Sequence, residues 1–260
     1  MVLSMTQMAL AIVSGSIVGF SLGLVGGGGS ILAVPLLVYV VGLDNPHVAI
    51  GTSAIAVALS AAANLAAHAR AGNVKWRCAA VFSVAGVIGA FFGSTLGKMV
   101  DGQRLLALFA ILMMVVGALM LRDRGRGGDP TVRLSQENFP KLVGLGLLAG
   151  LLSGFFGIGG GFLIVPSLML AAGMPILNAV GSSLVSVTAF GLTTAGNYAW
   201  SGLVDWLLAG LFVAGGLLGG LLGVWSAKSL ARRRGALTTA FAVLIFAVAL
   251  YMLARSLNVI

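Results

Sequence analysis

Two glycine-rich segments interrupt long apolar runs, and their residue types and spacing are suited to binding a ligand. The first consists of Gly26, Gly27, Gly28, Gly29 and Ser30, with Pro35 five residues further on; the second contains Gly157, Gly159, Gly160 and Gly161, followed by Pro166. A helix that starts after such a break points free backbone N–H groups and its positive dipole end at whatever lies before it. Glycine also lets an anion approach those amides closely. The pattern therefore favours an oxyanion site made of backbone, with tight helix packing or a kink as the alternative.

Neutral polar side chains follow each break at helical spacing. Ser53, Ser60, Asn64 and His68 are separated by 7, 4 and 4 residues, which places them on one face of a helix. The candidate binding residues in this stripe are Thr52, Ser53 and Asn64, with Ser182, Ser183 and Asn197 in the second half of the chain. Such donors suit an anion that is bound and then released, but hydrogen bonding between helices would use the same residues. His68 lies one turn from a basic loop, a position that favours an interfacial polar role over proton transfer.

Ionisable groups are absent from the interior of the apolar stretches. The six acids lie at or beyond the stretch ends, and no Lys or Arg lies inside one. Groups of this kind usually mark ion and proton pathways at membrane depth. We therefore expect no carboxylate proton relay and no charged clamp on the substrate. A single cysteine and the absence of buried oxygen anions also predict no metal site and no cofactor.

The composition decides the surroundings of the chain. Hydrophobic residues make up 59% and charged residues 8%, and the mean hydropathy is +1.11. About 25% of the residues of a soluble domain are charged, so this chain has too few charged residues to face water. We therefore expect its surface to contact the lipid bilayer. The net charge of +9 lies in loops, where it reports membrane topology and does not imply nucleic acid.

The chain is an internal duplication with an offset of 131, then 130, residues. We expect a first repeat at 1–121, a cytoplasmic linker at 122–140 and a second repeat at 141–260, forming one membrane domain. The prediction is an all-α polytopic bundle of 8–10 membrane segments, with glycine-broken helices or re-entrant hairpins and with both breaks near the midplane. The apolar stretches are 5–25, 30–43, 47–69, 78–97 and 105–121, then 141–157, 159–174, 177–200, 206–227 and 236–254.

Basic residues predict opposite orientations for the two repeats. Twelve of the 15 fall in clusters at 70–77, 122–141 and 228–234, and cytoplasmic loops carry the Lys/Arg excess. Equivalent loops of the two repeats differ in charge, because 70–77 is basic whereas 201–206 holds only Asp205. This favours inverted repeats with both termini outside. Parallel repeats of four crossings each would leave the asymmetry unexplained.

At these residues the chain resembles the TauE/SafE family of bacterial permeases, also called the sulfite exporter family. The resemblance covers nearly the whole chain, and its carriers are the two glycine motifs with their prolines, Gly51-Thr52-Ser53, Gly181-Ser182-Ser183, His68 with Gly72-Asn73-Val74, and Gly202 to Trp206. It implies secondary transport of small sulfur-containing anions such as sulfite, sulfoacetate or other organosulfonates, often outward, by a multi-pass inner-membrane protein.

The expected function is therefore that of an alternating-access transporter for a small anion, not an enzyme. A non-transporting membrane scaffold or assembly factor and a transporter of a different small anion are the alternatives. A phosphate-binding enzyme loop is disfavoured, because no lysine accompanies the glycines. The sequence does not decide whether the protein forms a homo-oligomer.

Overall fold

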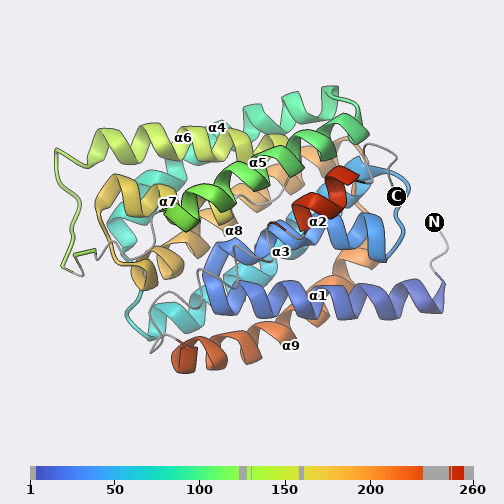
Figure 1. Ribbon diagram of the computed structural model, residues 1–260, viewed down its shortest axis with the longest axis horizontal. Helices are drawn as coiled ribbons and strands as arrows, with labels where there is room; N and C mark the ends of the chain where they lie inside the picture. Colours follow the sequence, from blue (N-terminus) through green and yellow to red (C-terminus); the bar gives the residue numbers. More distant parts are fainter. Residues whose placement is uncertain are drawn as a thin grey trace.

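The computed structural model describes residues 4–122, 128–129, 131–157, 161–230, 246 and 248–254, and within these ranges helices are joined by loops and turns with no strand (Figure 1). The first repeat comprises α1 (Met5–Val25), α3 (Pro46–Arg70), α4 (Trp76–Met99) and α5 (Gly102–Arg122). Between α1 and α3 lie the 3₁₀ helix η1 (Gly26–Leu32), α2 (Ala33–Pro35) and the π-helical η2 (Leu36–Val40). The second repeat comprises α6 (Phe139–Phe156), α7 (Gly161–Ala172), α8 (Ile176–Trp200) and α9 (Trp206–Leu230). Residues 248–254 are also helical, whereas most of the predicted stretch 236–254 lies outside the described residues.

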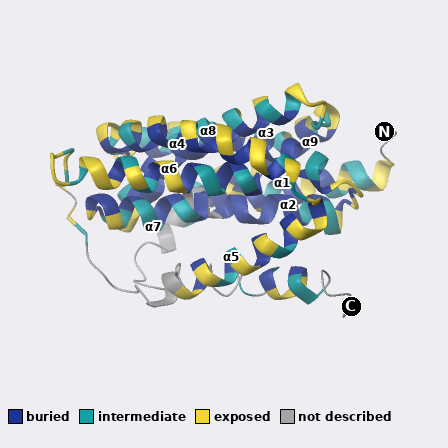
Figure 2. Ribbon diagram, turned by 90° about the horizontal axis from the view of Figure 1, so that it is seen from above, coloured by how far each residue is buried: buried dark blue, intermediate teal, exposed yellow. Residues whose placement is uncertain are grey.

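Six helices are long and apolar enough to cross a bilayer, and three shorter apolar helices accompany them within the described ranges. Large apolar side chains such as Phe92, Leu221 and Leu222 are exposed on the outside of the bundle, and buried residues concentrate on the inner helix faces (Figure 2). Trp200 and Trp206, at helix ends, are exposed as interfacial anchors are. The predicted all-α membrane bundle is confirmed.

Capping residues explain where several helices begin. Asn45 accepts a hydrogen bond from the His47 N–H ahead of Pro46, the first residue of α3. Asp101 accepts from the N–H groups of Gln103 and Arg104 at the start of α5, and Asp205 accepts from the Leu208 N–H in α9. Asp101 and Asp205 therefore serve as helix caps, which fits their position outside the apolar interior.

The first long helix of each repeat packs in parallel on the third long helix of the other repeat. A Cβ atom on successive glycines would meet successive backbone positions of the partner helix, so the two backbones are in close contact. The pairs along α1 and α9 are Gly15 with Phe212, Gly19 with Gly216 and Gly23 with Gly220; those along α6 and α4 are Gly146 with Phe82, Gly150 with Gly86 and Gly154 with Ala90.

The third apolar stretches, α3 and α8, lie antiparallel at the centre. Gly51, near the start of α3, contacts Tyr198 near the end of α8, whereas Gly191, further back on α8, contacts Ala54 and Ala58. Since α3 is parallel to α9 and α8 is parallel to α4, the long helices α1, α3 and α4 oppose their equivalents α6, α8 and α9. The repeats are inverted, and the parallel alternative is wrong.

Both broken segments return along the length of the helix that precedes them. The Gln7 amide, at the start of α1, donates to the Val41 carbonyl at the end of η2. In the second repeat the Asp129 N–H, in the linker before α6, donates to the Gly173 carbonyl directly after α7. A re-entrant hairpin would turn back halfway, so these segments are glycine-broken crossing segments (Figure 1).

The loops gather by charge at the two ends of the bundle. We call the end formed by loops 71–75, 128–138 and 173–175 the basic end; Asn178 of α8 contacts Asn73 there. We call the end formed by loops 42–45, 100–101 and 201–205 the acidic end, because Asp44, Asp101 and Asp205 lie on it. The third basic cluster, at 228–234, lies outside the residues whose side chains are described.

Candidate anion site at the glycine breaks

The second break lies toward the acidic end. Gly157 caps α6 in the left-handed conformation with φ of +67°, and a Cβ on it would meet Ile50 near the start of α3. Along α4, Gly97 packs on Phe155 of α6, so the break stands level with the last turn of α4. Gly161 begins α7 and is buried, whereas Gly159 and Gly160 lie outside the described residues.

The first break lies toward the basic end. Gly26, Gly27, Gly28, Gly29 and Ser30 form most of η1, directly after Gly23, which packs on Gly220 of α9 and lies against His68 of α3. The expectation that both breaks lie near the midplane is therefore wrong. Since α1 has 21 residues and α6 has 18, each rises about 27–32 Å before its break, close to the thickness of the hydrocarbon. Segments η1 and α7 nevertheless contact each other.

Thr52 and Ser182 join the two repeats at opposite ends. The Asp205 N–H donates to the Thr52 hydroxyl at 3.0 Å, and the Lys75 N–H donates to the Ser182 hydroxyl at 2.9 Å. The two contacts are equivalent in the duplication, and each ties the start of a helix in one repeat to the central helix of the other. A hydroxyl that accepts a hydrogen bond keeps its own proton for a second acceptor, so both residues can still donate to an anion.

The neighbouring serines are also equivalent in the two repeats. The Ser53 hydroxyl donates to the Ile50 carbonyl at 3.0 Å, and the Ser183 hydroxyl donates to the Val180 carbonyl at 2.8 Å. These are bonds within one helix turn, so binding a substrate would require each hydroxyl to rotate. The prediction that they bind the anion is untested by this geometry.

The two asparagines lie in contacts between helices. The Asn64 amide donates to the Ser60 carbonyl and packs against Gly220 of α9. The Asn197 amide donates to Ser94 and Thr95 of α4, and its oxygen accepts from the Lys98 ammonium at 2.7 Å. In this conformation Asn197 therefore serves the interhelical hydrogen bonding that the sequence left as an alternative.

The two prolines shape the segments that follow the breaks. Pro35 ends α2 and caps the π-helical turn η2, in which the Val41 N–H reaches back five residues to the Leu36 carbonyl. Pro166 lies inside α7. Proline lacks an N–H and clashes with the preceding turn, so it distorts these short segments, whereas the long helices continue undisturbed.

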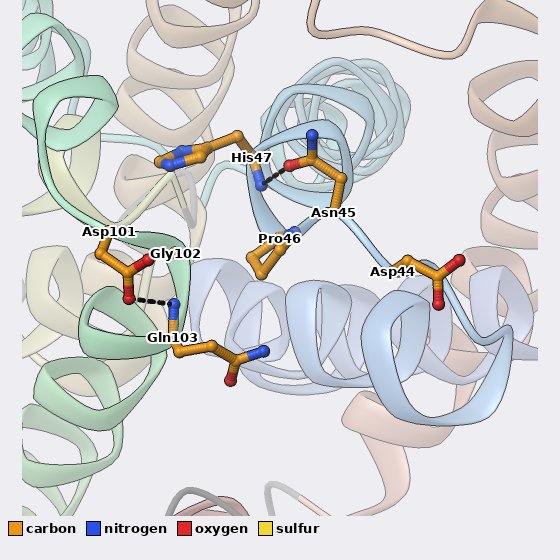
Figure 3. A pocket seen from close by; sticks show the side chains of 7 residues that line it. All are labelled: Asp44, Asn45, Pro46, His47, Asp101, Gly102 and Gln103. Carbon is orange, nitrogen blue, oxygen red and sulfur yellow. Dashed lines mark hydrogen bonds between the residues drawn. The ribbon is translucent and has the colours of Figure 1, made fainter.

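The described polar side chains of the candidate site are buried. Ser30, Thr52, Ser53, Ser182 and Ser183 are each at most 1% exposed. Two shallow surface hollows found among the described residues lie elsewhere: one at the basic end, lined by Leu134, Ser135, Gln136 and Phe139, and one at the acidic end, lined by Asp44 to His47 and Asp101 to Gln103 (Figure 3). Transport therefore requires a conformation in which these buried side chains become accessible.

Two buried residues that the sequence left outside the candidate site also stand out. His68 is 4% exposed and Tyr198 is fully buried, and they occupy equivalent positions at the offset of 130. The offset could have paired them from sequence, but their burial depends on the packing. Within the described ranges, no three His, Cys, Asp or Glu side chains gather as a metal ion would require.

An inverted repeat of apolar helices, broken by glycine in both halves, defines a polytopic membrane protein with transporter architecture. The chain belongs to the family described as sulfite exporter TauE/SafE, whose model matches residues 11–252. It is a multi-pass protein of the inner membrane and a member of a transporter family.

Relatives support this membership. The chain is 51% identical over 257 residues to a probable membrane transporter protein of Xylella fastidiosa (strain Temecula1), covering 98% of both chains. It is 28% identical over 237 residues to the probable membrane transporter protein YunE of Bacillus subtilis, covering 82% of this chain and 86% of the relative. It is also 28% identical over 205 residues to the probable membrane transporter protein MJ0441 of Methanocaldococcus jannaschii, covering 77% and 72%. No solved structure matches the chain at a significant level.

Proposed function

We propose that the protein exports small sulfur-containing anions, such as sulfite, sulfoacetate or other organosulfonates, by alternating access, without changing them chemically. The observation that carries the proposal is the pair of equivalent contacts between repeats, Thr52–Asp205 at the acidic end and Ser182–Lys75 at the basic end. Releasing one contact while the other holds would open one end only. The family description supports the choice of substrate class.

The site offers neutral donors to the substrate. Backbone N–H groups after the glycine breaks and the hydroxyls of Thr52 and Ser182 bind an oxyanion without a fixed positive charge. Such binding is strong enough to replace part of the hydration shell and weak enough to permit release. Asp101 and Asp205 cap helices at the acidic end, so these carboxylates lie away from the central path, where they would repel an anion.

The membrane potential is sufficient to drive export. With the interior negative, each negative charge that moves outward gains about 2.3 kcal/mol per 100 mV. No coupling ion is required by this arrangement, and a uniport mechanism is the simplest that the buried neutral residues support.

Flux from proteoliposomes tests the proposal. Purified protein is reconstituted into vesicles loaded with sulfite or sulfoacetate, with an inside-negative potential imposed by a potassium gradient and valinomycin. We expect efflux well above that of protein-free vesicles, and faster efflux when the potential is larger. Vesicles loaded with chloride or phosphate serve as the comparison. Flux of these anions without flux of sulfite or sulfonates would show that the protein transports a different class of anion. No flux of any anion would favour the alternative of a non-transporting membrane scaffold.

A further inference from the structure

Two large polar side chains are buried without hydrogen-bond partners at equivalent positions of the two repeats. The hydroxyl of Tyr198 forms no hydrogen bond with any described residue. Neither ring nitrogen of His68 forms a well-aligned one, and the polar group that lies beside the imidazole is the backbone of Gly23. Burying an unsatisfied polar group destabilises a protein, so native structures keep few of them. Two such groups at one repeat position point to a ligand that this closed conformation does not hold.

The local backbone around the two residues is the same. Both lie in the last turn of a central helix, α3 or α8. The Asn73 N–H donates to the His68 carbonyl, and the Leu203 N–H donates to the Tyr198 carbonyl. A left-handed glycine follows each, Gly72 with φ of +72° and Gly202 with φ of +69°. Both repeats therefore have the same helix-end backbone at this position, and each buries a polar side chain there.

Each residue lies beside one of the glycine breaks. His68 lies against Gly23, three residues before the first break. Tyr198 packs against Gly51, and the adjacent Ile50 fills the space beside Gly157 in the second break. The pair thus stands at the two levels where the broken segments begin, His68 toward the basic end and Tyr198 toward the acidic end.

Positive charge accompanies the tyrosine. The Lys98 ammonium lies 5.8 Å from the Tyr198 ring centroid and also contacts Ser201 at the acidic end. The His47 ring lies 6.3 Å from the Tyr198 ring, and the hollow that His47 lines opens at the acidic end (Figure 3). An anion that leaves the bundle at this end would pass from the tyrosine hydroxyl toward a cation.

We propose that His68 and Tyr198 donate hydrogen bonds to the transported anion, one at each end of its path. A neutral imidazole always carries one N–H donor, and the phenol carries one O–H donor, so both can bind an oxyanion. The anion supplies the acceptors that these donors lack in the closed conformation. The inference rests on the proposed anion transport and adds the residues that receive the anion beyond the glycine breaks.

Flux measurements test the donors directly. Tyr198→Phe removes only the hydroxyl, and His68→Leu removes the imidazole, whereas His68→Gln keeps an N–H donor. We expect Tyr198→Phe and His68→Leu to lower anion flux by about 10-fold or more, since hydrogen bonds to charged groups are the stronger class, and His68→Gln to recover part of it. Thr193→Val is the matched control on α8, because its hydroxyl is already satisfied by the Ala189 carbonyl. Unchanged flux in Tyr198→Phe and His68→Leu, with the wild type active, would overturn the inference and leave the proposed function intact.

Thermal unfolding separates a ligand donor from a structural one. A hydroxyl without a partner does not hold the fold together, so Tyr198→Phe should keep or raise the Tm in detergent. A lowered Tm together with lowered flux would show that the hydroxyl supports packing, against the inference.

Thiol accessibility tests the path without any substrate. In a Cys78→Ala background, Tyr198→Cys and His68→Cys are exposed to a membrane-impermeant maleimide from each side of vesicles. We expect Tyr198→Cys to react from the acidic end and His68→Cys from the basic end, although both positions are buried here. Failure of both to react in folded protein, or reaction of both from one side, would refute the placement even if no transported anion had been found.

Discussion

Replacing Thr52 by valine isolates the contact that closes the acidic end. Valine keeps the shape of the buried threonine and removes the hydroxyl that accepts the Asp205 N–H. Asp205 is only partly buried, so its N–H can find water when that end opens. The loss is therefore that of one ordinary hydrogen bond, about 0.5–1.5 kcal/mol. At about 1.4 kcal/mol per tenfold, the ratio of conformations open at the acidic end to closed ones rises roughly 2- to 12-fold.

Cysteine labelling at two buried positions measures this change in the open population. Ile50, 1% exposed near the acidic end, and Val180, its equivalent at the basic end and 6% exposed, are each changed to cysteine in a Cys78→Ala background. The labelling rate of a buried thiol follows the population of the open form. Thr52→Val should accelerate labelling of Ile50→Cys by the same roughly 2- to 12-fold, without accelerating labelling of Val180→Cys.

The matched change at the other end is Ser182→Ala, which removes the acceptor of the Lys75 N–H. It should accelerate labelling of Val180→Cys and not that of Ile50→Cys. Equal acceleration of both reporters by either variant would mean that the bundle loosens as a whole. Unchanged rates in all four combinations would show that these contacts do not control opening, and the reasoning from symmetry would be refuted.

Three further outcomes are expected. Gly150→Ala should lower the free energy of unfolding by about 1–3 kcal/mol, because a Cβ there meets the Gly86 backbone, whereas Gly144→Ala on the same helix meets nothing within 4 Å and should stabilise by about 0.5–1 kcal/mol; denaturant unfolding in mild detergent measures both, and equal effects would contradict the close packing. Asp205→Asn should keep at least half of the wild-type flux, because asparagine also caps α9, so complete loss of flux in folded protein would indicate a coupling carboxylate. Cysteines at the exposed positions Gln136 and Ser201 should react with an impermeant maleimide from opposite sides, Gln136→Cys from the cytoplasm; labelling from one side would contradict the topology.

Much of the helical architecture could be predicted from the sequence, because apolar length is a local property. The stretches at 47–69 and 177–200 became α3 (Pro46–Arg70) and α8 (Ile176–Trp200) within a few residues, since a run of about 20 apolar residues has no other way to satisfy its backbone in lipid. The charge difference between loops 70–77 and 201–206 was enough to predict inverted repeats. Duplication and orientation need only composition and order along the chain.

The site was less predictable, because its geometry depends on which helix lies beside which. Glycine runs do not reveal that α1 packs on α9, so neither the level of each break nor the contact of Gly157 with Ile50 could be read from them. The same hydroxyl pattern fits a binding site and a contact between repeats, and only the positions of Asp205 and Lys75 show which bonds Thr52 and Ser182 form. His68 and Tyr198 look like polar residues near helix ends. They are buried because other helices cover them, α1 beside His68 and α3 beside Tyr198, and burial of this kind arises from tertiary packing alone.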